Sequence, residues 1–181
     1  LLDLARKTLA KVALSGSVPR IDTNDVPRSL VQPKACFVTL TKKGEVRGCI
    51  GGFFPREPLF MAVVNMTYRA AMRDKRFKPV GADELGEIEI EISVLTVPRP
   101  LRFNSPEDLL ARLRPGADGV ILRVGRRQST YLPQVWQQMP SKEVFLSNLA
   151  RKAGLPPTAW RQPGVSVLTY QVEAFHEEQA R

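Results

Sequence analysis

Residues 45–52 read Glu45-Val46-Arg47-Gly48-Cys49-Ile50-Gly51-Gly52, so a thiol lies among three glycines and two residues after an arginine. Glycine weakens the interior of a strand and often marks a bulge, or the close approach of a ligand or another backbone. We therefore expect something to come near the main chain at this motif.

The sequence around the motif predicts a β-hairpin. Ala35–Thr41 and Glu45–Gly51 read as strands, and Lys43-Gly44 between them provides the positive φ of a tight turn. Pairing outward from that turn predicts three opposed pairs: Val38 with Cys49, Leu40 with Arg47, and Cys36 with Gly51.

This register bears on the two thiols. It places Cys36 and Cys49 on one face as diagonal neighbours, about 7–8 Å apart, whereas the Cα atoms of a disulfide lie roughly 4.4–6.8 Å apart. It also places Arg47 on the face of Cys49. A slip of one residue would put the thiols on opposite faces.

Periodicity and capping residues place the remaining elements. Helices are expected at Leu1–Leu14, at Pro58–Met72, after Ser105, and from Ser141 to Ala153; strands at Glu87–Val97, Gly119–Val124, Gln128–Leu132 and Val165–Phe175; and a long loop at Ser15–Lys34. Because hairpins recur among alternating strands and helices, we predict an α+β (mixed α/β) fold, with a largely antiparallel sheet flanked by helices.

Composition narrows the class of protein. The chain has 181 residues, 43% of them hydrophobic and 25% charged, which is typical of a globular domain. No run approaches the roughly 18 apolar residues of a membrane span. Two cysteines and one histidine are too few for a structural zinc site. We expect a cytoplasmic protein with no metal and no cofactor.

The net charge of +9 raises the question of nucleic-acid binding. The basic residues are scattered, however, with one denser run at residues 69–78, and no aromatic platform or zinc-finger signature accompanies them. A basic surface without a specific partner is the favoured interpretation, because net charge speaks mainly to solubility and non-specific binding.

Cys49 is the candidate catalytic residue, as a nucleophile or a redox sensor. Its reactivity would depend on a nearby cation, which raises the thiolate fraction, and Arg47 is placed to serve. A nucleophile also needs a base, and nothing in the sequence places the one histidine, His176, near Cys49. The alternative is that Cys49 is a small buried hydrophobic residue.

Arg47 and the glycine backbone form a second candidate, a site for a small anionic ligand. Glycines let N–H groups approach an anion, and arginine binds phosphate or carboxylate through two hydrogen bonds. The alternative is a glycine-rich turn with a surface arginine. The predicted ligand-binding residues at this motif and after the following helix are Arg47, Gly48, Ile50, Gly51, Asp74, Arg76 and Phe77.

Gln134 and Trp136 form a third candidate. Gln134 would line a groove, and Trp136 is counted with it among the predicted ligand-binding residues. The structural interpretation competes with this one, because a tryptophan is more often a core anchor whose N–H finds an internal partner.

Six stretches together resemble the AMMECR domain family, which includes protein A of the AmmeMemoRadiSam systems. They follow the family's order and span almost the whole chain: Cys36-Phe37-Val38-Thr39-Leu40, Val46-Arg47-Gly48-Cys49-Ile50-Gly51, Asp74-Lys75-Arg76-Phe77, Ile88-Glu89-Ile90-Glu91-Ile92-Ser93-Val94-Leu95, Tyr131-Leu132-Pro133-Gln134-Val135-Trp136, and Arg151-Lys152-Ala153-Gly154-Leu155-Pro156.

The resemblance implies one domain over residues 1–181 with a smaller subdomain inserted in it, and a groove faced by the glycine–cysteine motif. It also implies Memo-like and radical-SAM partner proteins, but it supplies no reaction. Many relatives have a histidine and a cysteine in the helix where this chain has Asn148 and Ala150. A metal or redox site built from those side chains would be missing here.

Two functional hypotheses follow. The first is binding of a small anionic ligand or modified substrate in a groove lined by Arg47-Gly48-Cys49-Ile50-Gly51, by an enzyme or an accessory subunit. The alternative is a basic module that binds nucleic acid or a protein partner without catalysis.

Overall fold

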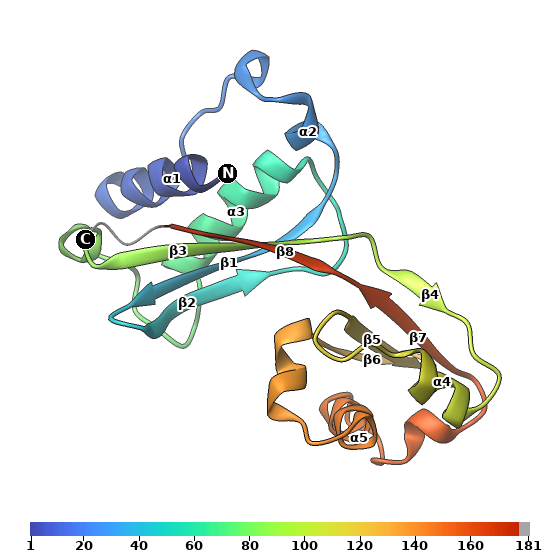
Figure 1. The fold of residues 1–181 in the computed structure, drawn as a ribbon. Coiled ribbons are helices and arrows are strands. Elements are labelled where there is room, and N and C mark those ends of the chain that lie inside the picture. The colour runs from blue at the N-terminus through green and yellow to red at the C-terminus, as the bar shows by residue number, and fades with distance from the viewer. Residues whose placement is uncertain (178–181) are drawn as a thin grey trace. The chain divides into compact units, whose positions relative to one another are not determined.

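The computed structural model describes residues 1–177 and divides the chain into two compact units (Figure 1). The first unit comprises Leu1–Val97 and the segment from Glu173, and the second comprises Pro98–Val172. Each unit has its own four-stranded sheet and its own buried core. The predicted α+β class with antiparallel pairing is confirmed, with two sheets where one was expected.

In the first unit the strand order is β2-β1-β3-β8. Its elements are α1 (Leu2–Ser15), η1 (Thr23–Asp25), α2 (Arg28–Val31), β1 (Ala35–Lys42), β2 (Glu45–Gly51), α3 (Leu59–Met72), η2 (Ala82–Glu84), β3 (Ile88–Leu95) and β8 (Val172–His176). The segment from Ser15 to Lys34, predicted as a loop, contains the short turns η1 and α2. The Asp22 side chain caps η1 by accepting the N–H of Asn24.

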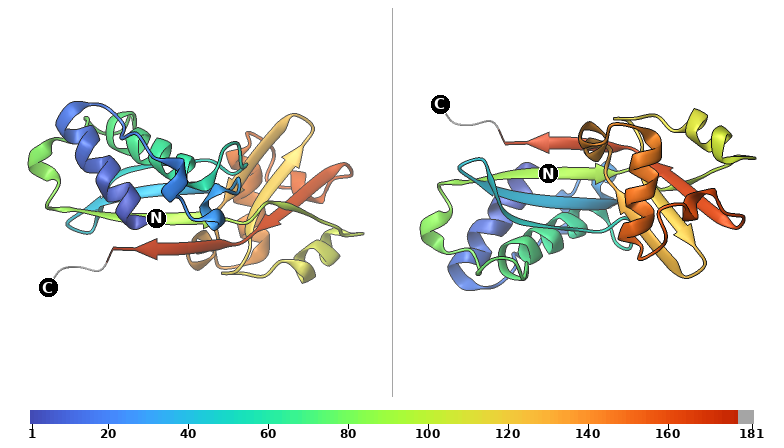
Figure 2. Two further views of the ribbon diagram at one scale, coloured as in Figure 1. Left: turned by 90° about the horizontal axis from the view of Figure 1, so that it is seen from above. Right: turned by 90° about the horizontal axis from the view of Figure 1, so that it is seen from below.

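Helices α1 and α3 pack on one face of this sheet (Figures 1 and 2). Leu9 and Val12 of α1 and Val63 of α3 are fully buried there. The strands contribute alternate residues to the same core, such as Val38 and Leu40, because successive side chains of a strand point to opposite faces. The other face carries no helix from the described residues of this unit.

In the second unit the strand order is β4-β7-β5-β6. Its elements are β4 (Arg99–Leu101), α4 (Pro106–Arg112), β5 (Gly119–Val124), β6 (Arg127–Tyr131), η3 (Pro133–Gln138), α5 (Lys142–Lys152), η4 (Ala159–Arg161) and β7 (Val165–Tyr170). The predicted capping serines are confirmed: Ser105 accepts the N–H of Asp108, and Ser141 accepts the N–H of Val144. The core gathers Phe145, Leu149 and Trp160 against the sheet.

The C-terminal strand differs from its prediction. The sequence from Val165 to Phe175 reads as one strand, but the structure interrupts it at Gln171. Strand β7 pairs with β4 and β5 in the second sheet, whereas β8 pairs with β3 in the first. Periodicity alone cannot show this division, because both halves alternate like strands.

Candidate functional site

The β1–β2 register differs by one residue from the prediction. The observed pairs are Val38 with Ile50, Thr39 with Cys49, Leu40 with Gly48, and Thr41 with Val46. Arg47 is therefore the extra residue of a β-bulge, since no β1 residue lies opposite it. The predicted register was wrong because counting outward from a turn assumes a strand without an inserted residue.

The bulge places the two cysteines on opposite faces of the sheet. Cys36 is 2% exposed and belongs to the core beneath the helices, on the face of Val38. Cys49 is half-buried on the other face, where the Thr39 hydroxyl donates to its sulfur at 3.3 Å. Both thiols are free. The diagonal arrangement on one face was a wrong prediction, and their opposite orientations leave no geometry for a disulfide.

A buried carboxylate connects the loop of residues 73–78 to β2. Asp74 accepts the N–H of Cys49 at 3.0 Å and the N–H of Arg76 at 3.1 Å. The Arg76 guanidinium binds both carboxylate oxygens of Asp74, at 3.0 and 2.6 Å, and donates to the Cys49 carbonyl at 3.3 Å. Because β2 is an edge strand, these bonds cover main-chain groups of Cys49 that have no neighbouring strand.

The charge of Asp74 is strongly stabilised. Its pKa lies well below its usual range, first because of the hydrogen bond from Arg76, and also because Cys49 and Arg76 donate backbone N–H groups; burial opposes this shift. Asp74 therefore holds this connection in its ionised form at neutral pH. The sequence placed Asp74 and Arg76 beside the motif, and the structure brings them together with Cys49.

Arg47 is occupied within the protein. Its guanidinium donates to both oxygens of Glu84, at 2.9 and 2.8 Å, and to the carbonyls of Lys78 and Pro79, at 3.0 and 3.4 Å. The hydrogen bond from Arg47 is the largest cause that lowers the pKa of Glu84 to about 2. The Arg47 side chain is 15% exposed. These contacts fix the bulge to η2 and to the end of the loop.

Phe77 lies beside both arginines. The guanidinium carbon of Arg76 is 5.2 Å from the centre of its ring, and that of Arg47 is 5.9 Å away. Cations over an aromatic ring are attracted by its quadrupole. Phe77 therefore helps to orient Arg76, whose side chain remains 58% exposed.

The glycines of the motif are explained by packing within the unit. A Cβ atom on Gly48 would lie 2.3 Å from the carbonyl oxygen of Ala70, so α3 approaches the strand here. A Cβ atom on Gly51 would lie 2.3 Å from the ring of Phe37. At Gly52 no atom lies within 4 Å of such a Cβ. The close approach expected at the motif is made by the chain itself at two of its three glycines. Ile50 packs against the same core.

His176 lies on β8 and contacts Glu91 of β3, with 3.4 Å between Nδ1 and Oε2. Glu91 pairs with Thr39, which pairs with Cys49, so these side chains mark one row across the sheet. Cys49 and His176 are three strands apart, which is roughly 14 Å at the usual strand spacing. His176 is therefore too far to act directly as the base for Cys49.

Gln134 and Trp136 lie on η3 in the second unit. Trp136 is 6% exposed, donates its Nε1–H to the carbonyl of Asp118 at 2.6 Å, and stacks on Phe145 with ring centres 3.5 Å apart. These contacts make it a core anchor. Gln134 is exposed on the same turn.

Two residues of this region were missed from the sequence. From the sequence, Thr39 is predicted only as part of a strand, and Glu84 is not singled out. The helix-start pattern could have signalled Glu84, because its side chain accepts the N–H of Gly81 three residues earlier. Its pairing with Arg47 has no local signal.

Glu84 and Glu87 of the first unit are engaged by basic residues. Glu87 contacts Lys42 and Lys43, at 3.2 and 3.1 Å. Within residues 1–177, no three His, Cys, Asp or Glu side chains are grouped as a metal site requires. In the same residues, no helix has both the length and the apolar character needed to cross a bilayer.

Comparison with known proteins identifies the family and supports the fold. The AMMECR1 family model matches residues 2–175. A protein of Methanothermobacter thermautotrophicus is 41% identical over 180 residues, covering 95% of this chain and 94% of its own length. One from Methanosarcina acetivorans is 37% identical over 179 residues, covering 97% and 89%. The crystal structure of uncharacterized protein PH0010 from Pyrococcus horikoshii superposes with a TM-score of 0.86 at 32% identity, covering 98% of this chain and 89% of that one.

These matches define an α+β protein of the AMMECR1 class. The chain belongs to the AMMECR1 family, as the resemblance of its motifs predicted.

Proposed function

We propose that this protein binds a small anionic ligand or modified substrate beside Cys49, at the loop of residues 73–78, and acts there as an enzyme or an accessory subunit. The observation that carries the proposal is the exposed guanidinium of Arg76, held against the main chain of a half-buried thiol.

The charge of this loop favours an anion. Among residues 73–78 four side chains are basic and exposed, and the one acid, Asp74, is buried and bound. The basic residues are Arg73, Lys75, Arg76 and Lys78. Arginine and lysine at such density attract phosphate or carboxylate groups, most strongly at low salt.

The roles within the motif change accordingly. Because the bonds of Arg47 end on Glu84 and two carbonyls, the proposal gives Arg47 a positioning role and gives Arg76 the contact with the ligand. Cys49 is the candidate reactive group. It accepts a hydrogen bond from the Thr39 hydroxyl.

If the protein acts as an accessory subunit and not as an enzyme, Cys49 has a different role. In that form the site would present a bound anion to a partner protein, for which the family resemblance suggests Memo-like and radical-SAM proteins in the cytoplasm. Cys49 would then contact the ligand without reacting.

A titration with pyrophosphate tests the proposal on the whole chain. For a dissociation constant near 1 mM, 10 mM ligand stabilises the folded state by about 1.4 kcal/mol, which raises Tm by about 3–6 °C. We expect this shift in the wild type and in Arg20→Gln, which changes an exposed arginine elsewhere in the first unit. We expect it to be lost in Arg76→Gln. Equal shifts in all three proteins, or none in the wild type, would contradict the proposal.

A module that binds nucleic acid is the second candidate, favoured by the net charge of +9. Its affinity for an oligonucleotide would fall steeply with salt, because bound counterions are released. Fluorescence anisotropy with a labelled 20-nucleotide strand separates the candidates. Absence of binding at 50 mM salt excludes this second function.

A further inference from the structure

We propose that the outer edge of β6 binds an extended acidic segment of a partner protein, which adds to the second sheet as an antiparallel strand. Strand β6 is the last in the order β4-β7-β5-β6, so within the described residues no strand pairs with its outer side. This edge lies wholly within Pro98–Val172 and shares no residue with the site at Cys49. Peptides that bind proteins in this way gain affinity from main-chain hydrogen bonds and specificity from alternate side chains.

The turn before β6 determines which main-chain groups face outward. A two-residue turn with a positive φ at Gly125 joins β5 to β6. In such a hairpin the residues that flank the turn, Val124 and Arg127, exchange hydrogen bonds. Bonded and non-bonded pairs then alternate along an antiparallel ladder. Gln128 and Thr130 therefore direct their N–H and C=O groups away from β5, to the outer edge.

Most of these outward groups have no partner in the protein. The Lys152 ammonium donates to the carbonyl of Thr130 at 3.0 Å, which agrees with the outward direction of that carbonyl. Within residues 1–177, no other hydrogen bond reaches the main-chain N–H and C=O groups of Gln128 or the N–H of Thr130. In this part of the chain, three of the four groups can therefore pair with an added strand.

Cations border the β6 edge at the turn and at the C-terminal end of α5. The five basic side chains are Arg123, Arg126, Arg127, Arg151 and Lys152, and all but the half-buried Arg123 are exposed. Arg127 donates to the carbonyl of Gly154, and the Lys152 ammonium lies 4.7 Å from the centre of the Tyr131 ring. These contacts hold both cations beside the edge without neutralising them, because the groups that they contact are uncharged.

The acids of the second unit lie elsewhere. The unit has eleven basic side chains and four acidic ones. Two of the acids are on α4, one is in the first turn of α5, and Asp118 is buried and paired with Arg114. Residues 119–142 and 144–172 contain no Asp or Glu. The carboxylates of an added strand would therefore be attracted by the cations of this edge and would meet no like charge on it.

Two other occupants fit this edge less well. A second copy of the chain, paired through β6, would bring Arg127 and Lys152 of both copies together, and like charges on paired strands are destabilising. Nucleic acid would satisfy the cations but would leave the outward main-chain groups of Gln128 and Thr130 unpaired. An extended acidic peptide satisfies both the cations and the main-chain groups.

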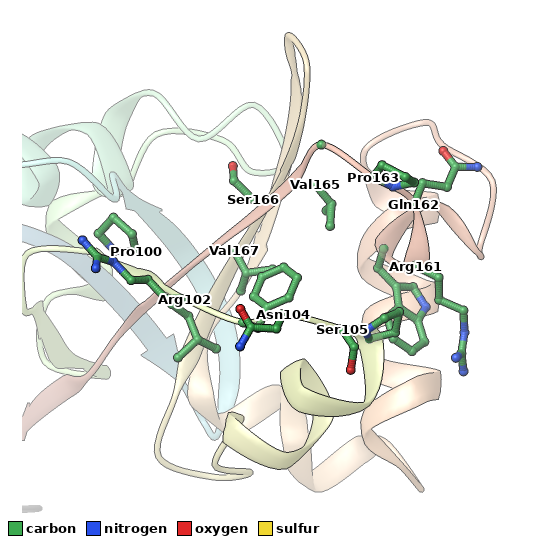
Figure 3. A pocket seen from close by; sticks show the side chains of 15 residues that line it. Pro100, Arg102, Asn104, Ser105, Arg161, Gln162, Pro163, Val165, Ser166 and Val167 are labelled. Carbon is green, nitrogen blue, oxygen red and sulfur yellow. The ribbon is translucent and has the colours of Figure 1, made fainter.

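The opposite edge of this sheet lacks these features. Strand β4 has three residues, and its Pro100 has no N–H to donate. After Leu101 the chain leaves β7, and a pocket of about 540 Å³ lies there (Figure 3). The side chains of Arg102 and Arg161 extend to opposite sides of this pocket, as Figure 3 shows, so they do not converge on one carboxylate.

The geometry of β6 predicts which groups of an added strand would face it. Ser129 donates to the carbonyl of Leu149 on α5, so Arg127 and Ser129 lie on the α5 face of the strand and Gln128 lies on the other. A residue that exchanges hydrogen bonds with Gln128 lies opposite it and shares its face. The remaining residues of the added strand point toward Arg127 and α5, and their own N–H groups face solvent.

NMR titration of the full chain with an alternating octapeptide of glutamate and valine tests the inference. The glutamates should lie on the α5 face, so the valine N–H groups should face β6. We expect amide shifts at residues 127–131. N-methylation of all four valines should weaken binding at least tenfold, whereas N-methylation of the four glutamates should change it less than threefold.

Four outcomes would overturn the inference. They are equal affinities of the two methylated peptides, equal binding of an alternating octapeptide of lysine and valine, no shift at 2 mM peptide, and shifts at residues 127–131 with a 20-nucleotide DNA strand but not with the peptide. The last outcome would assign this surface to nucleic acid. Shifts there that depend on protein concentration alone would assign it to a second copy and would also overturn the inference.

Three variants locate the charge. Lys152→Gln and Arg127→Gln should each weaken binding of the octapeptide at least threefold. Arg99→Gln, at an exposed residue of β4, should leave binding unchanged. Because Arg127 also binds the carbonyl of Gly154, Lys152→Gln keeps the test valid if Arg127→Gln unfolds. Unchanged affinity in a folded Lys152→Gln or Arg127→Gln protein would contradict the assigned role of that cation.

Discussion

Replacing Gly48 by alanine tests whether the glycine of the motif serves packing. The added Cβ would lie 2.3 Å from the Ala70 carbonyl oxygen, whereas ordinary contacts begin at 3.4 Å. Strand β2 or the backbone of α3 must therefore move by about 1 Å, because no flexible side chain can yield. Forcing an extra carbon into a packed region typically costs about 1–3 kcal/mol.

We expect Gly48→Ala to lower the free energy of unfolding by about 2 kcal/mol, or Tm by about 4–8 °C in a chain of this size. Denaturant unfolding followed by circular dichroism measures the change. Gly52→Ala is the matched control, because its Cβ meets no atom within 4 Å; its change should stay within about 0.5 kcal/mol. If Gly48→Ala kept full stability but lost pyrophosphate binding, a ligand rather than α3 would account for the glycine.

Three further predictions concern the loop, the bulge and the thiols. Asp74→Ala should destabilise the protein by about 2–3 kcal/mol in denaturant unfolding, because it removes two backbone hydrogen bonds and the ion pair with Arg76. The control Glu45→Ala, at an exposed residue, should cost under about 0.5 kcal/mol. Equal losses of stability in the two variants would show that Asp74 does not connect the loop of residues 73–78 to β2. The stability that Glu84 contributes should be complete above pH 4.5 and lost as pH falls toward about 2, because the pKa of Glu84 is lower in the folded than in the unfolded protein. The difference in unfolding free energy between wild type and Glu84→Gln should therefore shrink between pH 5 and 3. A difference that stays constant over this range would contradict the prediction. Iodoacetamide should label Cys49 much faster than Cys36, because burial raises the pKa of Cys36 to about 12. Peptide mapping measures the two rates. Equal rates would show that Cys36 is accessible.

Much of the fold could be predicted because its signals are local. Ser105 and Ser141 precede their helices with acids in the first turn, and the structure shows both capping bonds. Alternating residues such as Ile88 and Ile90 likewise marked a strand with one buried face. Each of these features depends on residues a few positions apart.

The site was less predictable because its contacts are distant in sequence. Arg47 pairs with Glu84, 37 residues away, and this contact accompanies the bulge that shifted the register. The pairing of Asp74 with the Cys49 main chain also depends on where α3 ends. Sequence reasoning placed Asp74 beside the motif, but it did not single out Glu84 and could not assign Arg47 to an internal ion pair.

The alkylation of Cys49 by two reagents of different charge tests the central claim most directly. A guanidinium about 6 Å away attracts an anion by about 0.7 kcal/mol in water, roughly threefold in rate. Relative to a free cysteine derivative, the ratio of iodoacetate to iodoacetamide rates at Cys49 should therefore be raised about threefold at low salt. This increase in the rate ratio should persist in Arg76→Lys and Arg20→Gln and disappear in Arg76→Gln. A ratio equal to that of the free thiol in the wild type would contradict an anion site at Cys49.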